Sequence, residues 1–96
     1  MFFTIIKDGL KLKIIDFGVS VKLTKNSNKC EGIQGQWNYR APEMLDQQEY
    51  DQAVDIWALG IIMFMCVAGR HPFIAPFSDT SDNIRNQAID FKEECW

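Results

Sequence analysis

The sequence predicts a small α+β fold in which an N-terminal β-hairpin is followed by about three helices. Two observations lead to this fold class: residues 2–14 have β-type patterning, and residues 42–91 carry helix start signals, stop signals and helical periodicity. The 96 residues are enough for one small domain. Hydrophobic residues make up 47% and charged residues 24% of the chain, which is typical of a globular protein rather than a disordered one.

The hairpin is predicted from two short runs and the turn between them. Residues 10–14 alternate Leu-Lys-Leu-Lys-Ile, the period-2 pattern of a half-buried strand, and residues 2–6 form a second β-rich run. Asp8 and Gly9 lie between the runs, and a tight hairpin turn favours this pair because it needs positive φ. Residues 19–23 indicate another short strand.

Two helices are predicted from their terminal signals. Pro42 suits the first position of a short helix, and Glu43 suits the positive end of its dipole. A longer helix should run over residues 53–68, with Gly69 as its left-handed cap and Pro72 just beyond. Its apolar residues occur on all sides, so we expect it to be buried on every face.

A third helix is predicted near the C-terminus. Ile84, Ala88 and Phe91 fall at helical spacing, and Ser81 is a candidate N-cap.

Charge and cysteine content exclude several classes of protein. Ten Lys and Arg against 13 Asp and Glu give a net charge of −3, so no basic field favours nucleic acid. The apolar run over residues 57–68 is shorter than the roughly 20 residues of a membrane span. Cys30, Cys66 and Cys95 are too few and too irregular for a disulfide framework, so we expect a reducing, cytoplasmic location. Cys66 lies in the apolar run and is interpreted as a small buried hydrophobe.

The triplet Asp16-Phe17-Gly18 at the end of the second predicted strand is a candidate metal site. Mg²⁺ commonly takes only one or two carboxylates and completes its shell with phosphate and water oxygens. The alternative interpretation is an Asp that makes a local turn hydrogen bond.

Further motifs follow this triplet in a characteristic order. They are Ala41-Pro42-Glu43, the run Asp-Ile-Trp-Ala-Leu-Gly at residues 55–60, and Gly-Arg-His-Pro-Phe at residues 69–73. Over nearly its whole length the chain resembles the C-terminal lobe of a eukaryotic protein kinase. Residues 38–40 and 69–73 are more similar to the serine/threonine branch than to the tyrosine branch.

The resemblance implies an incomplete kinase C-lobe with three parts: the hairpin and DFG motif at 1–18, an activation segment at 16–43, and a helical part at 42–96. Asp16 would hold Mg²⁺ against the phosphates of ATP, and Phe17 would be the packing residue that separates active from inactive states. Thr24 and Ser27 are candidate regulatory phosphosites, although a solvated polar loop would have the same composition.

Other residues match structural motifs of the family. Glu43 resembles the glutamate that pairs with an arginine near the end of the lobe, and Asp55 resembles the aspartate of a central buried helix that braces the catalytic loop. The full set of matched structural positions is Phe17, Gly18, Ala41, Pro42, Glu43, Asp55, Trp57 and Gly60.

The 96 residues lack several parts that the family's chemistry needs. The glycine-rich phosphate loop, the ATP-binding lysine and the HRD loop are absent; the sole histidine is His71 and the first asparagine is Asn26, both after DFG. Gly35 is followed by Gln36 where the family has threonine. The resemblance therefore implies ATP- and Mg²⁺-dependent transfer to a protein substrate, but we expect no catalytic residue and no catalysis from this chain alone.

Three interpretations remain open. The chain is part of a working serine/threonine kinase, or a catalytically dead relative that binds a protein partner through the apolar helix at 53–68, or an unrelated mixed α/β domain whose motifs are coincidental.

Overall fold

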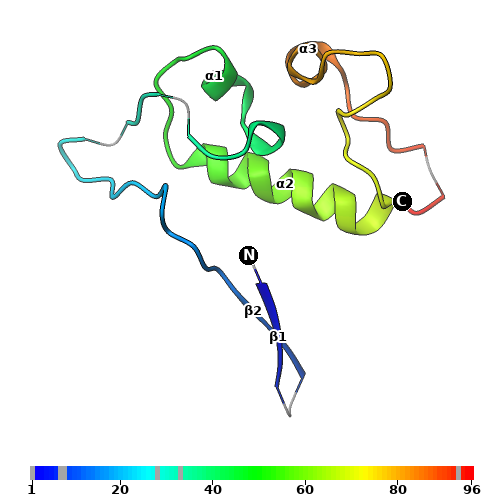
Figure 1. Ribbon diagram of the computed structural model, residues 1–96, viewed down its shortest axis with the longest axis horizontal. Helices are drawn as coiled ribbons and strands as arrows, with labels where there is room; N and C mark the ends of the chain where they lie inside the picture. The colour runs from blue at the N-terminus through cyan, green and yellow to red at the C-terminus, as the bar shows by residue number, and fades with distance from the viewer. Residues whose placement is uncertain (1, 7–8, 28, 33, 93) are drawn as a thin grey trace.

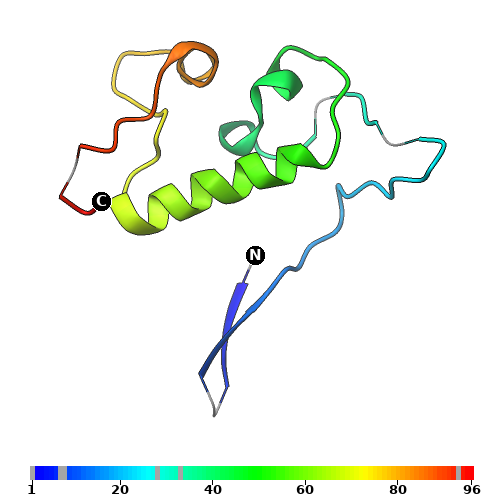
Figure 2. The same cartoon turned by 180° about the vertical axis from the view of Figure 1, so that it is seen from behind.

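The computed structural model describes residues 2–6, 9–27, 29–32, 34–92 and 94–96. Within them, three α-helices follow a strand pair and a short 3₁₀ helix, as the sequence predicts for the helices (Figure 1). The elements are β1 (Phe2–Ile6), β2 (Gly9–Lys13), the 3₁₀ helix η1 (Trp37–Tyr39), α1 (Pro42–Leu45), α2 (Ala53–Ala68) and α3 (Thr80–Asn86). Figures 1 and 2 show α1 and α3 on one side of α2, and the strands projecting on the other.

The two strands pair antiparallel, with Phe2 opposite Lys13 and Ile6 opposite Gly9. Gly9 has a φ of 129°, a conformation that L side chains rarely adopt. The other half of the predicted Asp8-Gly9 turn lies outside the described residues.

The chain after β2 differs from the sequence prediction. β2 ends at Lys13, so Asp16 lies beyond the strand rather than at its end. The strand expected at residues 19–23 is wrong: no ladder forms there, and Val19 and Val21 are exposed. A β pattern becomes a strand only where a neighbouring backbone supplies hydrogen bonds, and none in the described chain does so for this stretch.

The first two predicted helices are confirmed. α1 begins at Pro42, with Glu43 in its first turn. α2 spans the predicted residues, and Gly69 closes it with a φ of 70°. The Gly69 N–H donates to the Met65 carbonyl over 2.9 Å, which satisfies one of the carbonyls left open at the helix end.

The prediction that α2 is buried on every face is wrong. Ile61 and Phe64 are buried, but Ile56 is 71% exposed and Met63 61% exposed. We call the stripe formed by Ile56, Leu59, Met63 and Val67 the exposed α2 face. Cys66 is also exposed, contrary to prediction, because helical spacing from Leu59 and Met63 places it on the same side.

The core consists of two small clusters joined by one tryptophan. One cluster holds Ala41, Met44 and Tyr50, and the other holds Ile61, Phe73 and Ile84. The Trp57 side chain packs against both, and its ring stacks on Phe73 with centroids 5.7 Å apart and planes within 5°. Trp57 thus connects α2 to the segments before and after it.

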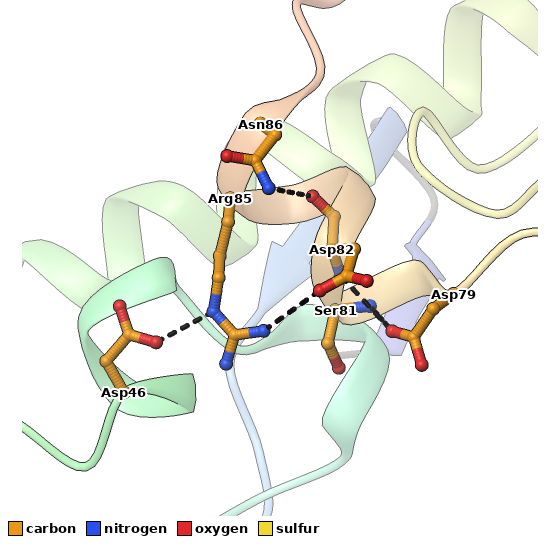
Figure 3. A network of polar contacts seen from close by, with 6 residues as sticks. All are labelled: Asp46, Asp79, Ser81, Asp82, Arg85 and Asn86. Atoms are coloured by element: carbon orange, nitrogen blue, oxygen red, sulfur yellow. Dashed lines mark hydrogen bonds and ion pairs between the residues drawn. The ribbon is translucent and has the colours of Figure 1, made fainter.

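The third helix begins and ends earlier than predicted. Asp79, not Ser81, is the N-cap: its Oδ1 accepts from the Ser81 and Asp82 N–H groups at 2.8 and 3.2 Å (Figure 3). The backbone is extended at Gln87, so Ala88 and Phe91 fall outside the helix. Phe91 packs instead against Phe64 and Trp96.

An arginine ties α3 to α1. Arg85 Nε donates to Asp46 Oδ1 over 2.7 Å, and Arg85 Nη1 lies 3.6 Å from Asp82 Oδ1 (Figure 3). This pairing holds the end of α1 beside α3. Among the described residues, no helix is long and apolar enough to cross a membrane.

Candidate functional site

Asp16 lies in an exposed turn. Its φ is 64°, and its Oδ1 accepts a 3.3 Å hydrogen bond from the Gly18 N–H. The Ser20 N–H and hydroxyl both donate to the Phe17 carbonyl, at 3.0 and 2.7 Å. The local turn bond considered from sequence is therefore present. It engages one carboxylate oxygen, while the Phe17 ring is 67% exposed.

The donor set around Asp16 fits Mg²⁺ only as part of a larger shell. In the described part of the chain, no three His, Cys, Asp or Glu side chains cluster as a metal site. One carboxylate agrees with the way Mg²⁺ is held when phosphates and water supply the remaining oxygens. Asp16 is thus a candidate ligand but not a self-sufficient metal site.

The two candidate phosphosites face each other across a tight loop. Thr24 and Ser27 exchange backbone hydrogen bonds of 3.0 and 3.1 Å, and the Ser27 N–H also lies 3.2 Å from Thr24 Oγ1. Both residues are exposed.

Two sets of contacts hold the rest of the predicted activation segment. Cys30 and Tyr50 form an isolated antiparallel bridge, with N–H···O distances of 2.7 and 3.0 Å. Arg40 donates from Nε to the Gln34 carbonyl at 3.1 Å and from Nη2 to the Gly35 carbonyl at 2.6 Å. These contacts shape the chain that leads into α1.

The matched structural residues differ in burial: Phe17, Gly18, Asp55 and Gly60 are exposed, and Pro42, Glu43 and Trp57 are half-buried. Ala41 is buried and lies in the cluster against which Trp57 packs, so the structure brings the start of α1 and the first turns of α2 together. Asp55 and Gly60 are exposed on α2. Asp16 is exposed and belongs to neither core cluster. The segment that contains it runs from β2 to the helical part (Figure 1).

His71, part of the Gly-Arg-His-Pro-Phe motif, has a structural role that the sequence did not predict. Its ring is buried, its Nε2 lies 2.8 Å from the Asn38 carbonyl, and its Nδ1 accepts from the Phe73 N–H at 3.1 Å. These contacts place the proton on Nε2 and join η1 to the loop after α2. In the sequence, its position between the end of the helix predicted at 53–68 and Phe73 was the available signal for a structural role.

Asp51 was also missed. Its Oδ1 accepts the Ala53 N–H over 2.8 Å at the start of α2, and its Oδ2 lies 3.6 Å from Lys29 Nζ. The backbone hydrogen bond from Ala53, followed by the charge of Lys29, lowers the pKa of Asp51. An Asp just before a predicted helix is an N-terminal signal that the sequence did contain.

Asp51 also borders a hollow on the surface of the chain. The hollow has a volume of about 370 Å³ and is lined by Leu23, Thr24, Lys25, Asp51 and Gln52. It lies between the predicted activation segment and the start of α2, so it places a candidate phosphosite and a carboxylate on the same cavity.

Comparison of the sequence with known proteins identifies a family. The protein kinase domain family matches residues 4–95. Serine/threonine-protein kinase 33 of Mus musculus is 34% identical over 93 residues, which cover 92% of this chain and 18% of that protein. Calcium-dependent protein kinase 27 of Arabidopsis thaliana is 36% identical over 90 residues, covering 93% of this chain and 18% of the relative.

A third relative is similar over a slightly shorter stretch. The Aurora kinase of Saccharomyces cerevisiae is 36% identical over 81 residues, which cover 84% of this chain and 22% of that kinase. The chain thus spans about a fifth of the length of the curated relatives it matches.

Proposed function

This chain belongs to the protein kinase domain family, and we propose that within a serine/threonine kinase it supplies a Mg²⁺-binding aspartate and the activation segment. The single observation that carries the proposal is Asp16: an exposed carboxylate in a tight turn, followed by Phe17 and Gly18. The order of the later motifs supports the same assignment.

Asp16 would hold Mg²⁺ together with ATP phosphate oxygens. The bound ion would neutralise charge that develops on the phosphates during transfer. The residues of this chain would orient the site: the Gly18 N–H fixes one carboxylate oxygen of Asp16, and Ser20 closes the turn at Phe17. The segment that follows would present a protein substrate, and phosphorylation of Thr24 or Ser27 would regulate it.

These 96 residues alone would not transfer phosphate. They contain no glycine-rich phosphate loop, no matching ATP lysine and no HRD base, and one carboxylate cannot position ATP. The small number and irregular spacing of Cys30, Cys66 and Cys95 support the reducing, cytoplasmic location that we propose.

A chimeric kinase tests the proposed role. The chain's residues would replace the matching segment of the Saccharomyces cerevisiae Aurora kinase, and radiolabel transfer from ATP to a protein substrate would be measured. We expect the chimera to transfer phosphate to the protein substrate. Asp16→Asn should abolish this transfer, whereas Asp90→Asn, a change at another exposed acid, should leave it unchanged. Equal activity of the two variants would refute the role of Asp16.

A second candidate function is a non-catalytic interaction module, and the exposed α2 face favours it. Four apolar side chains on one helix stripe form a surface of the kind that binds other proteins. In that case a chimera that folds but shows no transfer would be expected. Ile56→Lys together with Met63→Lys would then abolish self-association or partner binding, measured by sedimentation.

A further inference from the structure

The described chain leaves two apolar surfaces open to solvent. One is the exposed α2 face, defined above. The other lies on residues 11–25, which we call the arm, and its exposed apolar side chains are Leu12, Ile14, Ile15, Phe17, Val19 and Val21. Exposed apolar surfaces of this kind are typical of sites that bind another protein.

The arm does not cover the α2 face of its own chain. Figures 1 and 2 show the strand pair, which leads into the arm, projecting from the helical part. The radius of gyration is 15.6 Å, whereas a compact domain of about 100 residues has a value of about 13 Å. Ile56 and Met63 remain 71% and 61% exposed in this arrangement, so both surfaces are available to a second molecule.

The two surfaces belong to parts of the chain with opposite charge. The arm carries four Lys and one Asp, whereas residues 30–96 carry eleven Asp and Glu against four Lys and Arg. The arm lysines are exposed, and Lys11 and Lys13 flank Leu12. Asp55 is also exposed and precedes Leu59 by one helical turn, so it borders the exposed α2 face. A positive apolar arm therefore complements the apolar face of an acidic helical part.

We propose that two copies of this chain form a closed dimer in which the arm of each copy lies on the exposed α2 face of the other. Leu12 and Val19 supply apolar contacts, and the arm lysines lie against the acidic helical part. The proposal rests on the second candidate function, the interaction module. It deepens that function by naming the partner and both contact surfaces.

A second copy fits because one chain carries both complementary surfaces. Two-fold symmetry repeats each arm-to-face contact, so the dimer is closed and covers both arms and both faces. Pairing of two α2 faces directly would leave both arms uncovered. It would also bring two acidic helical parts together, which like charge disfavours.

Sedimentation equilibrium of the full 96-residue chain measures the dimer. The buffer contains a reductant, because Cys66 and Cys95 are exposed and could otherwise link two copies covalently.

Two double variants and one control separate the contact surfaces. The arm variant combines Leu12→Ser with Val19→Ser, and the face variant combines Ile56→Ser with Met63→Ser. The control combines Ile74→Ser with Phe77→Ser, which changes exposed apolar side chains outside both surfaces. All six side chains are exposed, so circular dichroism at 222 nm should match the parent chain in each case.

We expect the arm variant and the face variant each to raise the dimer dissociation constant by about tenfold or more, the scale of losing central apolar contacts. The control should leave it unchanged. An equal mixture of the arm and face variants should dimerise at concentrations where each alone is monomeric. The mixed dimer regains one intact contact, because the face variant keeps a normal arm and the arm variant keeps a normal face.

Salt gives a second readout. Raising NaCl from about 0.05 M to about 0.5 M should weaken the parent dimer, because it screens the attraction between the arm and the helical part. A dimer that tightens with salt would contradict the proposed charge pairing.

Weakened association in both variants without rescue on mixing would overturn the arm exchange and leave the interaction module standing. A parent chain that stays monomeric, or that grows beyond two copies, would overturn the closed dimer. The measurement uses neither ATP nor metal, so the chimera and this experiment can fail independently.

Discussion

Replacing Phe73 with Ala should destabilise the chain more than most other single truncations. Phe73 is 2% exposed, stacks on Trp57, and shares a cluster with Ile61 and Ile84. Truncating a buried Phe costs about 3–5 kcal/mol. The cluster has only three buried members and partly exposed neighbours that can collapse, so we expect about 3 kcal/mol.

The size of this effect matters because the total stability is small. A chain of 96 residues is expected to have a free energy of unfolding of about 5–14 kcal/mol. Urea unfolding followed by circular dichroism at 222 nm measures the loss, which at a typical slope shifts the midpoint by about 2 M. Phe73→Leu, which keeps most of the side chain, gives a measurable value if Phe73→Ala does not fold.

Phe77→Ala is the matched control. Phe77 is fully exposed, so the same chemical change there should alter the free energy of unfolding by no more than about 0.5 kcal/mol. A difference between the two alanine variants below about 1 kcal/mol would show that the Trp57–Phe73 stack does not hold the helical part together.

The remaining predictions concern the ends of α2. Gly69→Ala should lower the free energy of unfolding in urea by about 1 kcal/mol, because Gly69 has a φ of 70°. Gly60→Ala inside the helix should be neutral or stabilising, because an added Cβ meets nothing within 4 Å. Equal effects of the two variants would contradict the cap assignment. The lowered pKa of Asp51 means that its contribution to stability is fully present above the ordinary value of 3.8 and is lost as the pH falls through the lower folded-state value. Unfolding midpoints at neutral pH and at about pH 3 should therefore differ less in Asp51→Asn than in the parent chain, and an unchanged difference would argue against this role.

The sequence predicted those helix boundaries that local chemistry determines. Pro42 begins α1, and Gly69 ends α2, because one residue fixes φ and the other accepts a left-handed conformation. The motif order also predicted the kinase family, which the match over residues 4–95 confirms.

Other features depended on tertiary contacts that local patterns do not encode. The apolar pattern of α2 did not reveal which side would be covered, so Cys66 was wrongly expected to be buried. Helical spacing extended α3 to Phe91, but that ring packs on Phe64 and Trp96 outside the helix. Ser81 looked like a cap, yet Asp79 accepts the first-turn N–H groups.

The candidate site was predicted in outline only. Asp16 was expected at the end of a strand and lies beyond it, and the turn bond to Gly18 was one of its two interpretations. The contacts of Asp51 with Lys29 join residues far apart in the sequence, so no local pattern could indicate them.

Metal binding by the chimeric kinase tests the central claim most directly. Electron paramagnetic resonance would count Mn²⁺ bound in the presence of ATP, for the parent chimera and for its Asp16→Asn and Asp90→Asn variants. We expect Asp16→Asn to weaken Mn²⁺ binding by about tenfold or more, the scale of losing a metal-site group, and Asp90→Asn to leave it unchanged. Equal Mn²⁺ affinity of the parent and the Asp16→Asn variant would contradict the assignment of Asp16 as a metal ligand.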